Sequence, residues 1–209
     1  YCEETWDSGA STEVATVCAN NGKVDVTIAL KDNLDVTAEN KTVTYNGNAH
    51  AFNNVTCSVE GATIAYGETE GTYNLTDVPA DKVNADTYTL YYQVTAPGYA
   101  PKTGSYTLTI ESAEIKYTVT NYEAKYDDQY HTITVTVQEP AAGATITYSK
   151  TEDGEYTSDA PTYVMGNTNE TVWFKITAPN YTEVKGYGTV KINEADITID
   201  ITTNDRVTY

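Results

Sequence analysis

Positive charge is scarce in this sequence of 209 residues. Twelve lysine and arginine residues stand against 30 aspartates and glutamates, which gives a net charge of -18, and Arg206 is the single arginine. Such an acidic chain repels phosphate backbones and anionic lipid surfaces. Nucleic acid is therefore excluded as a partner. No run of 18 apolar residues occurs, so the sequence predicts no membrane-spanning helix and no direct membrane insertion.

Phenylalanine, methionine and cysteine are also scarce. Two Phe and one Met leave Val, Ile, Leu and Tyr to build any hydrophobic core. The three cysteines are an odd number, so they cannot all pair within one chain. Cys2 and Cys18 either form a disulfide across a short loop or stay free. We expect Cys57 to be a small free or buried thiol.

Tyrosine and threonine dominate what is present, and they alternate with apolar residues. In the stretch from Tyr88 to Val94, Leu90 and Tyr92 share one predicted face, while Thr89 and Tyr91 share the other. No long stretch has a helical period. The pattern predicts an all-β protein.

The β pattern repeats at a fixed interval of 82 residues. Thr95-Ala-Pro97 returns as Thr177-Ala-Pro179, and Gly61-Ala-Thr-Ile64 returns as Gly143-Ala-Thr-Ile146. A fixed period of this length indicates a repeated domain. Each copy holds six or seven short predicted strands in roughly 80 residues, a spacing typical of a β-sandwich.

The repeat divides the chain into four predicted segments. Apolar alternation on both sides of Asn21-Gly22, a strong turn dipeptide, predicts a hairpin before the first repeat. Asn204-Asp-Arg-Val-Thr-Tyr209 resembles Asn40-Lys-Thr-Val-Thr-Tyr45, so a third unit begins after the second. The hairpin segment, the two repeats and the start of the third unit occupy residues 1–34, 35–115, 116–197 and 198–209.

Two motifs carry a family resemblance. Tyr45-Asn-Gly-Asn-Ala-His50 and the stretch from Asn84 to Val94, together with the Thr-Ala-Pro and Ala-x-Ile endings, resemble tandem bacterial Ig-like repeats of cell-surface proteins, notably of Gram-positive gut bacteria. The resemblance implies tandem Ig-like β-sandwich domains with a secreted, surface-attached, non-catalytic role. It also implies a tyrosine corner at Tyr88, where the second repeat has Glu170 instead.

Catalytic and metal-binding patterns are missing. His50 and His131, the only histidines, occupy the same position of the repeat at a local offset of 81, so we expect structural hydrogen bonds from both rather than catalysis. No Cys-x-x-Cys, EF-hand or phosphate-loop motif occurs. Acidic pairs such as Asp127-Asp128 are interpreted as solvated charge, with Ca²⁺ at loops as the alternative. The sequence thus predicts no enzyme, no catalytic residue, no cofactor and no metal site.

Three aromatic residues are candidates for carbohydrate binding. Tyr91 and Trp173 occupy equivalent repeat positions on the polar face of a predicted strand, and Trp6 lies in an irregular N-terminal stretch. A ring exposed on a flat sheet suits stacking on the apolar face of a sugar. In the alternative interpretation, Trp173 packs beneath a loop or at a junction between units.

Two functions therefore remain open. In one, the repeats are an extracellular spacer or adhesion scaffold within a longer protein that carries further repeats. In the other, the chain is a carbohydrate-binding module for starch-like or other polysaccharides, or for host or cell-surface glycans. Both place the protein outside the cell, secreted or at the cell surface.

Overall fold

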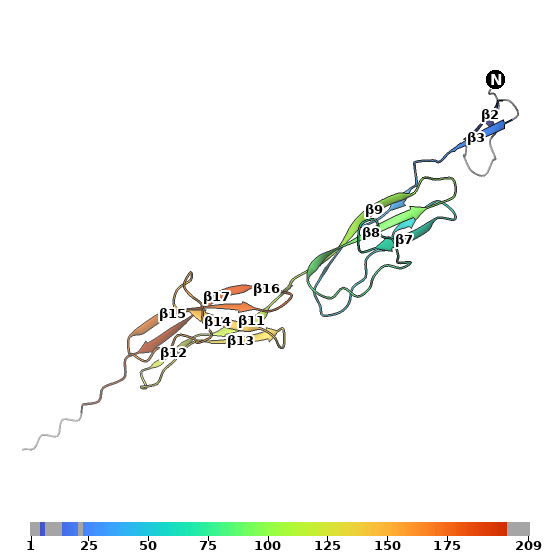
Figure 1. The fold of residues 1–209 in the computed structure, drawn as a ribbon. Helices are drawn as coiled ribbons and strands as arrows, with labels where there is room; N and C mark the ends of the chain where they lie inside the picture. The colour runs from blue at the N-terminus through green and yellow to red at the C-terminus, as the bar shows by residue number, and fades with distance from the viewer. Residues whose placement is uncertain (1–4, 7–13, 21–22, 200–209) are drawn as a thin grey trace, which may run out of the picture. The chain divides into compact units, whose positions relative to one another are not determined.

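Strands and turns make up the chain in the computed structural model, which describes residues 5–6, 14–20 and 23–199, with side chains described from residue 30 onward. None of these described residues is helical. The chain divides into two compact units between Ser112 and Ala113 (Figure 1). The division falls three residues before the boundary expected from the sequence, because Ile115 is buried in the second unit's core.

A small N-terminal sheet contains the predicted hairpin. Strands β2 (Val14–Asn20) and β3 (Lys23–Ala29) pair antiparallel along their whole length, and β1 (Thr5–Trp6) adds to β2. The hairpin is therefore confirmed. Cys2, the turn at Asn21-Gly22 and the side chains of β2 and β3, Cys18 among them, lie outside the described residues.

The strands from β4 to β9 form what we call the first sandwich. Its main sheet has the order β5-β9-β8-β7, in which β5 runs parallel to β9 and the other neighbours are antiparallel. A second, smaller sheet pairs β4 with β6. The bounds are β4 Val36–Thr37, β5 Lys41–Thr44, β6 Thr56–Cys57, β7 Thr63–Gly67, β8 Asp86–Thr95 and β9 Lys102–Glu111.

The strands from β10 to β17 form the second sandwich with the same plan. Its main sheet has the order β12-β17-β15-β14. Here β12 runs parallel to β17, and the other neighbours are antiparallel. Two smaller pairs are β11-β13 and β10-β16. The bounds are β10 Ala113–Glu114, β11 Lys116–Thr120, β12 Tyr122–Lys125, β13 Thr134–Glu139, β14 Thr145–Ser149, β15 Thr168–Thr177, β16 Tyr181–Thr182 and β17 Val184–Asn193.

This topology is that of an immunoglobulin-like sandwich. In the second sandwich the chain pairs first with one sheet through β11 and then crosses to the other through β12, where it meets the last strand. The all-β, tandem Ig-like fold expected from the sequence is thus confirmed. The alternation of Val55, Cys57 and Val59 with polar residues predicts a longer strand than the structure has, since only Thr56–Cys57 is strand.

The two main sheets agree residue by residue. Tyr66 lies opposite Tyr92 in the first sandwich, and Tyr148 lies opposite Phe174 in the second, as the repeat predicts. The neighbouring strand, β9 or β17, carries a glycine opposite Tyr92 and opposite Phe174. A Cβ at Gly104 would lie 2.4 Å from Tyr92 Oη, and a Cβ at Gly186 would lie 2.5 Å from Phe174 Cζ. The repeat therefore preserves an aromatic ring packed on a bare backbone.

Each sandwich has its own hydrophobic core. Tyrosine supplies much of the first one, and its hydroxyls find backbone partners: Tyr66 Oη accepts from the Val55 N–H at 3.2 Å, and Tyr106 Oη donates to the Asn53 carbonyl at 2.7 Å. Burial, and then the neighbouring Tyr66, raise the pKa of Tyr106. The buried residues are Leu34, Phe52, Val55, Tyr66, Leu90, Tyr92, Val94, Tyr106, Leu108 and Ile110 in the first core, and Ile115, Ile133, Val135, Val172, Phe174, Ile176, Val190 and Ile192 in the second.

Two smaller expectations are settled in the first sandwich. Tyr88 Oη donates to the carbonyl of Asn84 at 3.1 Å, which is the tyrosine corner that the family resemblance implies. The second sandwich has the exposed Glu170 at that position. Cys57 is a free thiol, packed at the margin of the first core.

Candidate functional site

The outer face of the second main sheet carries a pair of aromatic side chains. Trp173 on β15 and Tyr187 on β17 are register partners, and their ring centroids lie 5.0 Å apart at an interplanar angle of 51°. Alternation turns both away from the core, where Val172 and Phe174 are almost fully buried. Trp173 is half-buried and Tyr187 is 60% exposed, so the pair presents aromatic surface to solvent.

The neighbouring row on this face is polar and charged. Lys175 and Lys185 lie directly opposite each other, two residues along their strands from the aromatic pair. Lys175 Nζ sits 4.6 Å from the ring centroid of Tyr156. Burial alone would lower the pKa of Lys185, but a hydrogen bond to Asp153 at 3.3 Å and the negative charges nearby raise it.

Carboxylates surround both lysines. Glu183 lies 3.9 Å from Lys175, and Glu152 lies 3.7 Å from Lys185. On the opposite side of the aromatic pair, Thr171 and Thr189 are register partners. We call the aromatic pair and the lysine row together the aromatic–lysine face, made of Trp173, Tyr187, Lys175 and Lys185.

The first sandwich has a different set of residues at the same positions. Tyr91 pairs with Ser105, and Gln93 pairs with Thr103. Tyr91 is half-buried. Because the register is the same in both sheets, the Ig-like fold forms with either set. The aromatic–lysine face is therefore a property of the second sandwich and not a requirement of its fold.

The three predicted site residues lie on three different sheets. Trp173 and Tyr91 occupy equivalent places in separate sandwiches, and Trp6 pairs with Ala15 in the N-terminal sheet, with its side chain outside the described residues. Tyr187 is not among the residues predicted from the sequence. Alternation could have identified it, because the period of two that places Val190 in the core places Tyr187 on the outer face with Trp173.

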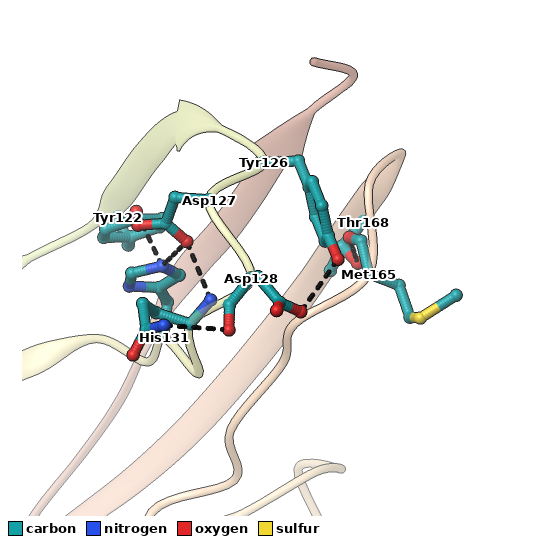
Figure 2. A network of polar contacts seen from close by, with 8 residues as sticks. Tyr122, Tyr126, Asp127, Asp128, His131, Met165 and Thr168 are labelled. Carbon is teal, nitrogen blue, oxygen red and sulfur yellow. Dashed lines mark hydrogen bonds and ion pairs between the residues drawn. The ribbon is translucent and has the colours of Figure 1, made fainter.

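A second polar cluster lies at the loop between β12 and β13. His131 Nε2 lies 2.8 Å from Asp127 Oδ1 and 3.0 Å from Tyr122 Oη, and its ring stacks on Tyr122 at 3.9 Å (Figure 2). The carboxylate can only accept, so Nε2 carries a proton. The hydrogen bond from His131, and then the backbone N–H of Gln129, hold the pKa of Asp127 below its usual value.

We call the contact between a histidine Nε2 and the side-chain oxygen four residues earlier the loop clamp. The first sandwich has the same clamp, with an asparagine in place of the aspartate. His50 Nε2 lies 3.1 Å from Asn46 Oδ1, and Asn46 also accepts from the Asn48 N–H at 2.9 Å. Both histidines also join a backbone bridge, His50 with Lys82 and His131 with Tyr163. The structural hydrogen bonds expected from the histidines are confirmed. Each clamp fastens its loop by the side chain four residues earlier.

A shallow hollow of about 440 Å³ adjoins the second clamp. Tyr126 lines it, with its hydroxyl donating to Asp128 Oδ1 at 2.9 Å (Figure 2). That hydrogen bond raises the pKa of Tyr126. Met165, which is largely exposed, and Ile197 complete its apolar side, while Asn167 Nδ2 donates to Glu194 Oε1 at 2.6 Å on the polar side.

The described residues contain no group of three or more His, Cys, Asp or Glu side chains that could hold a metal ion. Asp127 and Asp128 are each engaged by a neighbouring side chain, as described above. In the same part of the chain, no helix is long and apolar enough to cross a membrane.

No protein-family model and no curated protein matches the chain. Among solved structures, it is similar to extracellular cadherin domains 3–6 of protocadherin gamma B2, with 12% identity, a TM-score of 0.32, and coverage of 77% of this chain and 47% of that one. Drosophila OTK extracellular domains 3–5 have 12% identity and a TM-score of 0.28, with 79% and 68% covered. Fibronectin(III)-like modules of Clostridium thermocellum CbhA have 9% identity and a TM-score of 0.26, with 82% and 99% covered.

The chain thus spans about half the length of the protocadherin chain it matches, at 47%. At these identities and TM-scores, the fold assignment rests on the strand order and register of the chain itself. The solved structures named above contain cadherin domains and fibronectin(III)-like modules.

Proposed function

We propose that the chain is a non-catalytic, load-bearing spacer in an extracellular surface protein, built from tandem Ig-like units. The observation that carries this function is the pairing of the first strand with the last. In both sandwiches the strand through which the chain enters the main sheet, β5 or β12, lies parallel to the strand through which it leaves, β9 or β17.

Parallel pairing determines how tension acts on each unit. When the two chain ends are pulled apart, the entry strand is drawn from its beginning and the exit strand from its end, which are opposite ends of the shared ladder. All the hydrogen bonds between the two strands then carry the load together and are sheared, rather than opened one after another. The bonds that close the ladder are Tyr45 N–H to Glu111 O at 2.8 Å and Tyr126 N–H to Asn193 O at 2.9 Å.

In both units an asparagine side chain adds a hydrogen bond, which we call the bracket, between the entry segment and the exit strand. Asn40, just before β5, accepts the Thr107 N–H of β9 at 2.9 Å. Asn121, just before β12, accepts the Thr189 N–H of β17 at 2.9 Å. The entry segment is thereby tied to the exit strand outside the regular ladder. A bracket kept in both repeats supports a load-bearing role.

Single-molecule stretching of the full chain tests this function. We expect two force peaks, each releasing roughly 230 Å of chain, because the 71 residues from Lys41 to Glu111 and the 72 from Tyr122 to Asn193 extend at about 3.3 Å each. Tyr45→Pro removes one ladder donor, so it lowers one peak more than the matched control Tyr45→Ala, which keeps the N–H. Extension without resolved peaks, or equal peaks for the Pro and Ala variants, contradicts a sheared ladder.

The residues after β17 are proposed as the first strand of a third unit. Ile197 and Ile199 lie 82 residues after Ile115 and Tyr117, which pack in the second core. Ile115 is 6% exposed, whereas Ile197 is 85% exposed. An apolar pair exposed at positions that pack in the core of the preceding repeat supports a partner sandwich formed by further repeats of a longer protein.

Matched serine substitutions test the third unit. Ile115→Ser lowers the thermal midpoint of the second sandwich, since it removes buried apolar surface and adds a buried hydroxyl. Ile197→Ser leaves the midpoint of this chain unchanged. In a chain extended by a further repeat, the same Ile197→Ser becomes destabilising. A neutral result in the extended chain rules out this assignment.

Carbohydrate binding is a second candidate function, and the exposed aromatic pair on the second sandwich favours it. Trp173 with Tyr187 presents aromatic surface beside groups that donate and accept hydrogen bonds. Tyr91, at the equivalent position of the first sandwich, pairs with Ser105 instead of an aromatic residue, and Trp6 stays a candidate in the N-terminal sheet. Retention of the chain on insoluble starch or other polysaccharides, lost in Trp173→Ala without a large change in thermal midpoint, is the expected result. A large fall in midpoint instead assigns Trp173 to packing.

A further inference from the structure

The aromatic–lysine face differs from its counterpart in ways that the fold does not require. At the same four register positions, the first sandwich has Tyr91, Ser105, Gln93 and Thr103. Two lysines directly opposite each other repel, so the lysine row is unfavourable for sheet stability by itself. The repulsion is offset by carboxylates beside both lysines, and this compensated row lies next to an exposed aromatic pair in only one of two equal sheets, which supports a binding role.

The groups around the aromatic pair match the chemistry of a sugar. The rings of Trp173 and Tyr187 offer an apolar surface for the C–H face of a pyranose. The amines of Lys175 and Lys185 donate hydrogen bonds, and the carboxylates beside them accept. A ligand with many hydroxyls, each able to donate and accept, uses both kinds of group.

Charge distinguishes between classes of glycan. Around the lysine row, two positive side chains face the three carboxylates Glu152, Asp153 and Glu183. The local balance is therefore one negative charge, in a chain whose net charge is -18. This field repels uronates, sulfates and sialic acids, and it leaves a neutral saccharide unaffected.

We infer that the aromatic–lysine face of the second sandwich binds neutral polysaccharide chains lying across β15 and β17, and that the corresponding face of the first sandwich does not. This inference rests on the second candidate function, and it assigns the ligand class and the residues of that site. Trp173 and Tyr187 stack on sugar rings, while Lys175 and Lys185 bond to hydroxyls next to them. The three carboxylates position the amines and exclude anionic chains.

Native gel electrophoresis of the full chain tests the inference, with soluble starch or hydroxyethyl cellulose in the gel and their carboxymethyl derivatives as anionic counterparts. We expect retardation in the neutral gels alone. The key variant gives the second sandwich the residues of the first: Trp173→Tyr, Tyr187→Ser, Lys175→Gln and Lys185→Thr. It should fold, because the first sandwich carries this set in the same register.

The exchanged variant should bind about tenfold more weakly or worse, because it loses one stacking ring and exchanges another. Tyr91→Ala is the matched control and should keep full retardation. The reverse exchange in the first sandwich, with Tyr91→Trp, Ser105→Tyr, Gln93→Lys and Thr103→Lys, should increase retardation.

Each outcome separates one claim from another. No retardation in any gel overturns both this inference and the carbohydrate-binding function, while the spacer function stands. Retardation in the anionic gels alone overturns the neutral class but not carbohydrate binding. Unchanged retardation of the exchanged variant places binding elsewhere, and loss in Tyr91→Ala assigns it to the first sandwich.

Discussion

Replacing Phe174 by leucine should destabilise the second sandwich and leave the first unaffected. The ring is 1% exposed, lies over Gly186, and meets Tyr117 edge-on at a centroid distance of 5.6 Å. Losing the aromatic pair costs about 0.5–1.5 kcal/mol, and the void above the glycine adds a similar amount. We expect a total of about 2 kcal/mol, which for a domain of this size lowers the midpoint by roughly 8–16 °C.

Differential scanning calorimetry of the full chain measures this effect. The two sandwiches have separate cores, so we expect two transitions, of which Phe174→Leu moves one. The equivalent substitution, Tyr92→Leu, should move the other. If either variant shifts both transitions by the same amount, the sandwiches unfold as one cooperative unit and the reasoning from separate cores is wrong.

Three further substitutions have defined outcomes. Tyr88→Phe removes the hydrogen bond to Asn84 and should lower the stability of the first sandwich by about 0.5–1.5 kcal/mol in urea unfolding, while an unchanged midpoint would show that the corner contributes nothing. Gly186→Ala forces a Cβ against the ring of Phe174 and should cost the second sandwich about 1–3 kcal/mol by the same assay, while an unchanged midpoint would show that the ring moves aside at no cost. Asp127 has a lowered pKa, so its contribution is present above the ordinary value of 3.8 and is lost as the pH falls through the folded value. Between about pH 5 and pH 3, the thermal midpoint of the second sandwich should therefore fall less in Asp127→Asn than in the unmodified chain. Equal falls would assign the acid sensitivity to other groups.

Alternation and repetition predicted much of the fold. The faces of β8 and β9, the equivalence of Tyr66 with Tyr148 and the hairpin at β2 and β3 follow from local sequence, because period-two burial and turn dipeptides act over a few residues. The offset of 82, which is 81 around β5 and β12, then transferred the elements of one sandwich to the other. Local signals of this kind also placed Trp173 on the outer face.

Other features depend on which strands become neighbours, and alternation does not determine that. The parallel pairing of β5 with β9 joins residues about 67 positions apart, and no turn signal links them. The pairing of Trp173 with Tyr187 depends on the register of β15 with β17, which a change of one residue would destroy. The polar clamp at His131 was recognised as structural, but the stacked Tyr122 was not expected, because the first sandwich has Lys41 at that position.

The dependence of unfolding force on pulling direction tests the load-bearing spacer most directly. With handles at Tyr122 and Asn193, the second sandwich is pulled along its parallel ladder and all the β12–β17 bonds are sheared together. With handles at Thr145 and Thr177, which are register partners at one end of β14 and β15, the edge strand is peeled away one pair at a time. We predict a clearly higher force for the first direction. Equal forces, or a higher force for peeling, would contradict the role of the entry and exit strands as the load-bearing element.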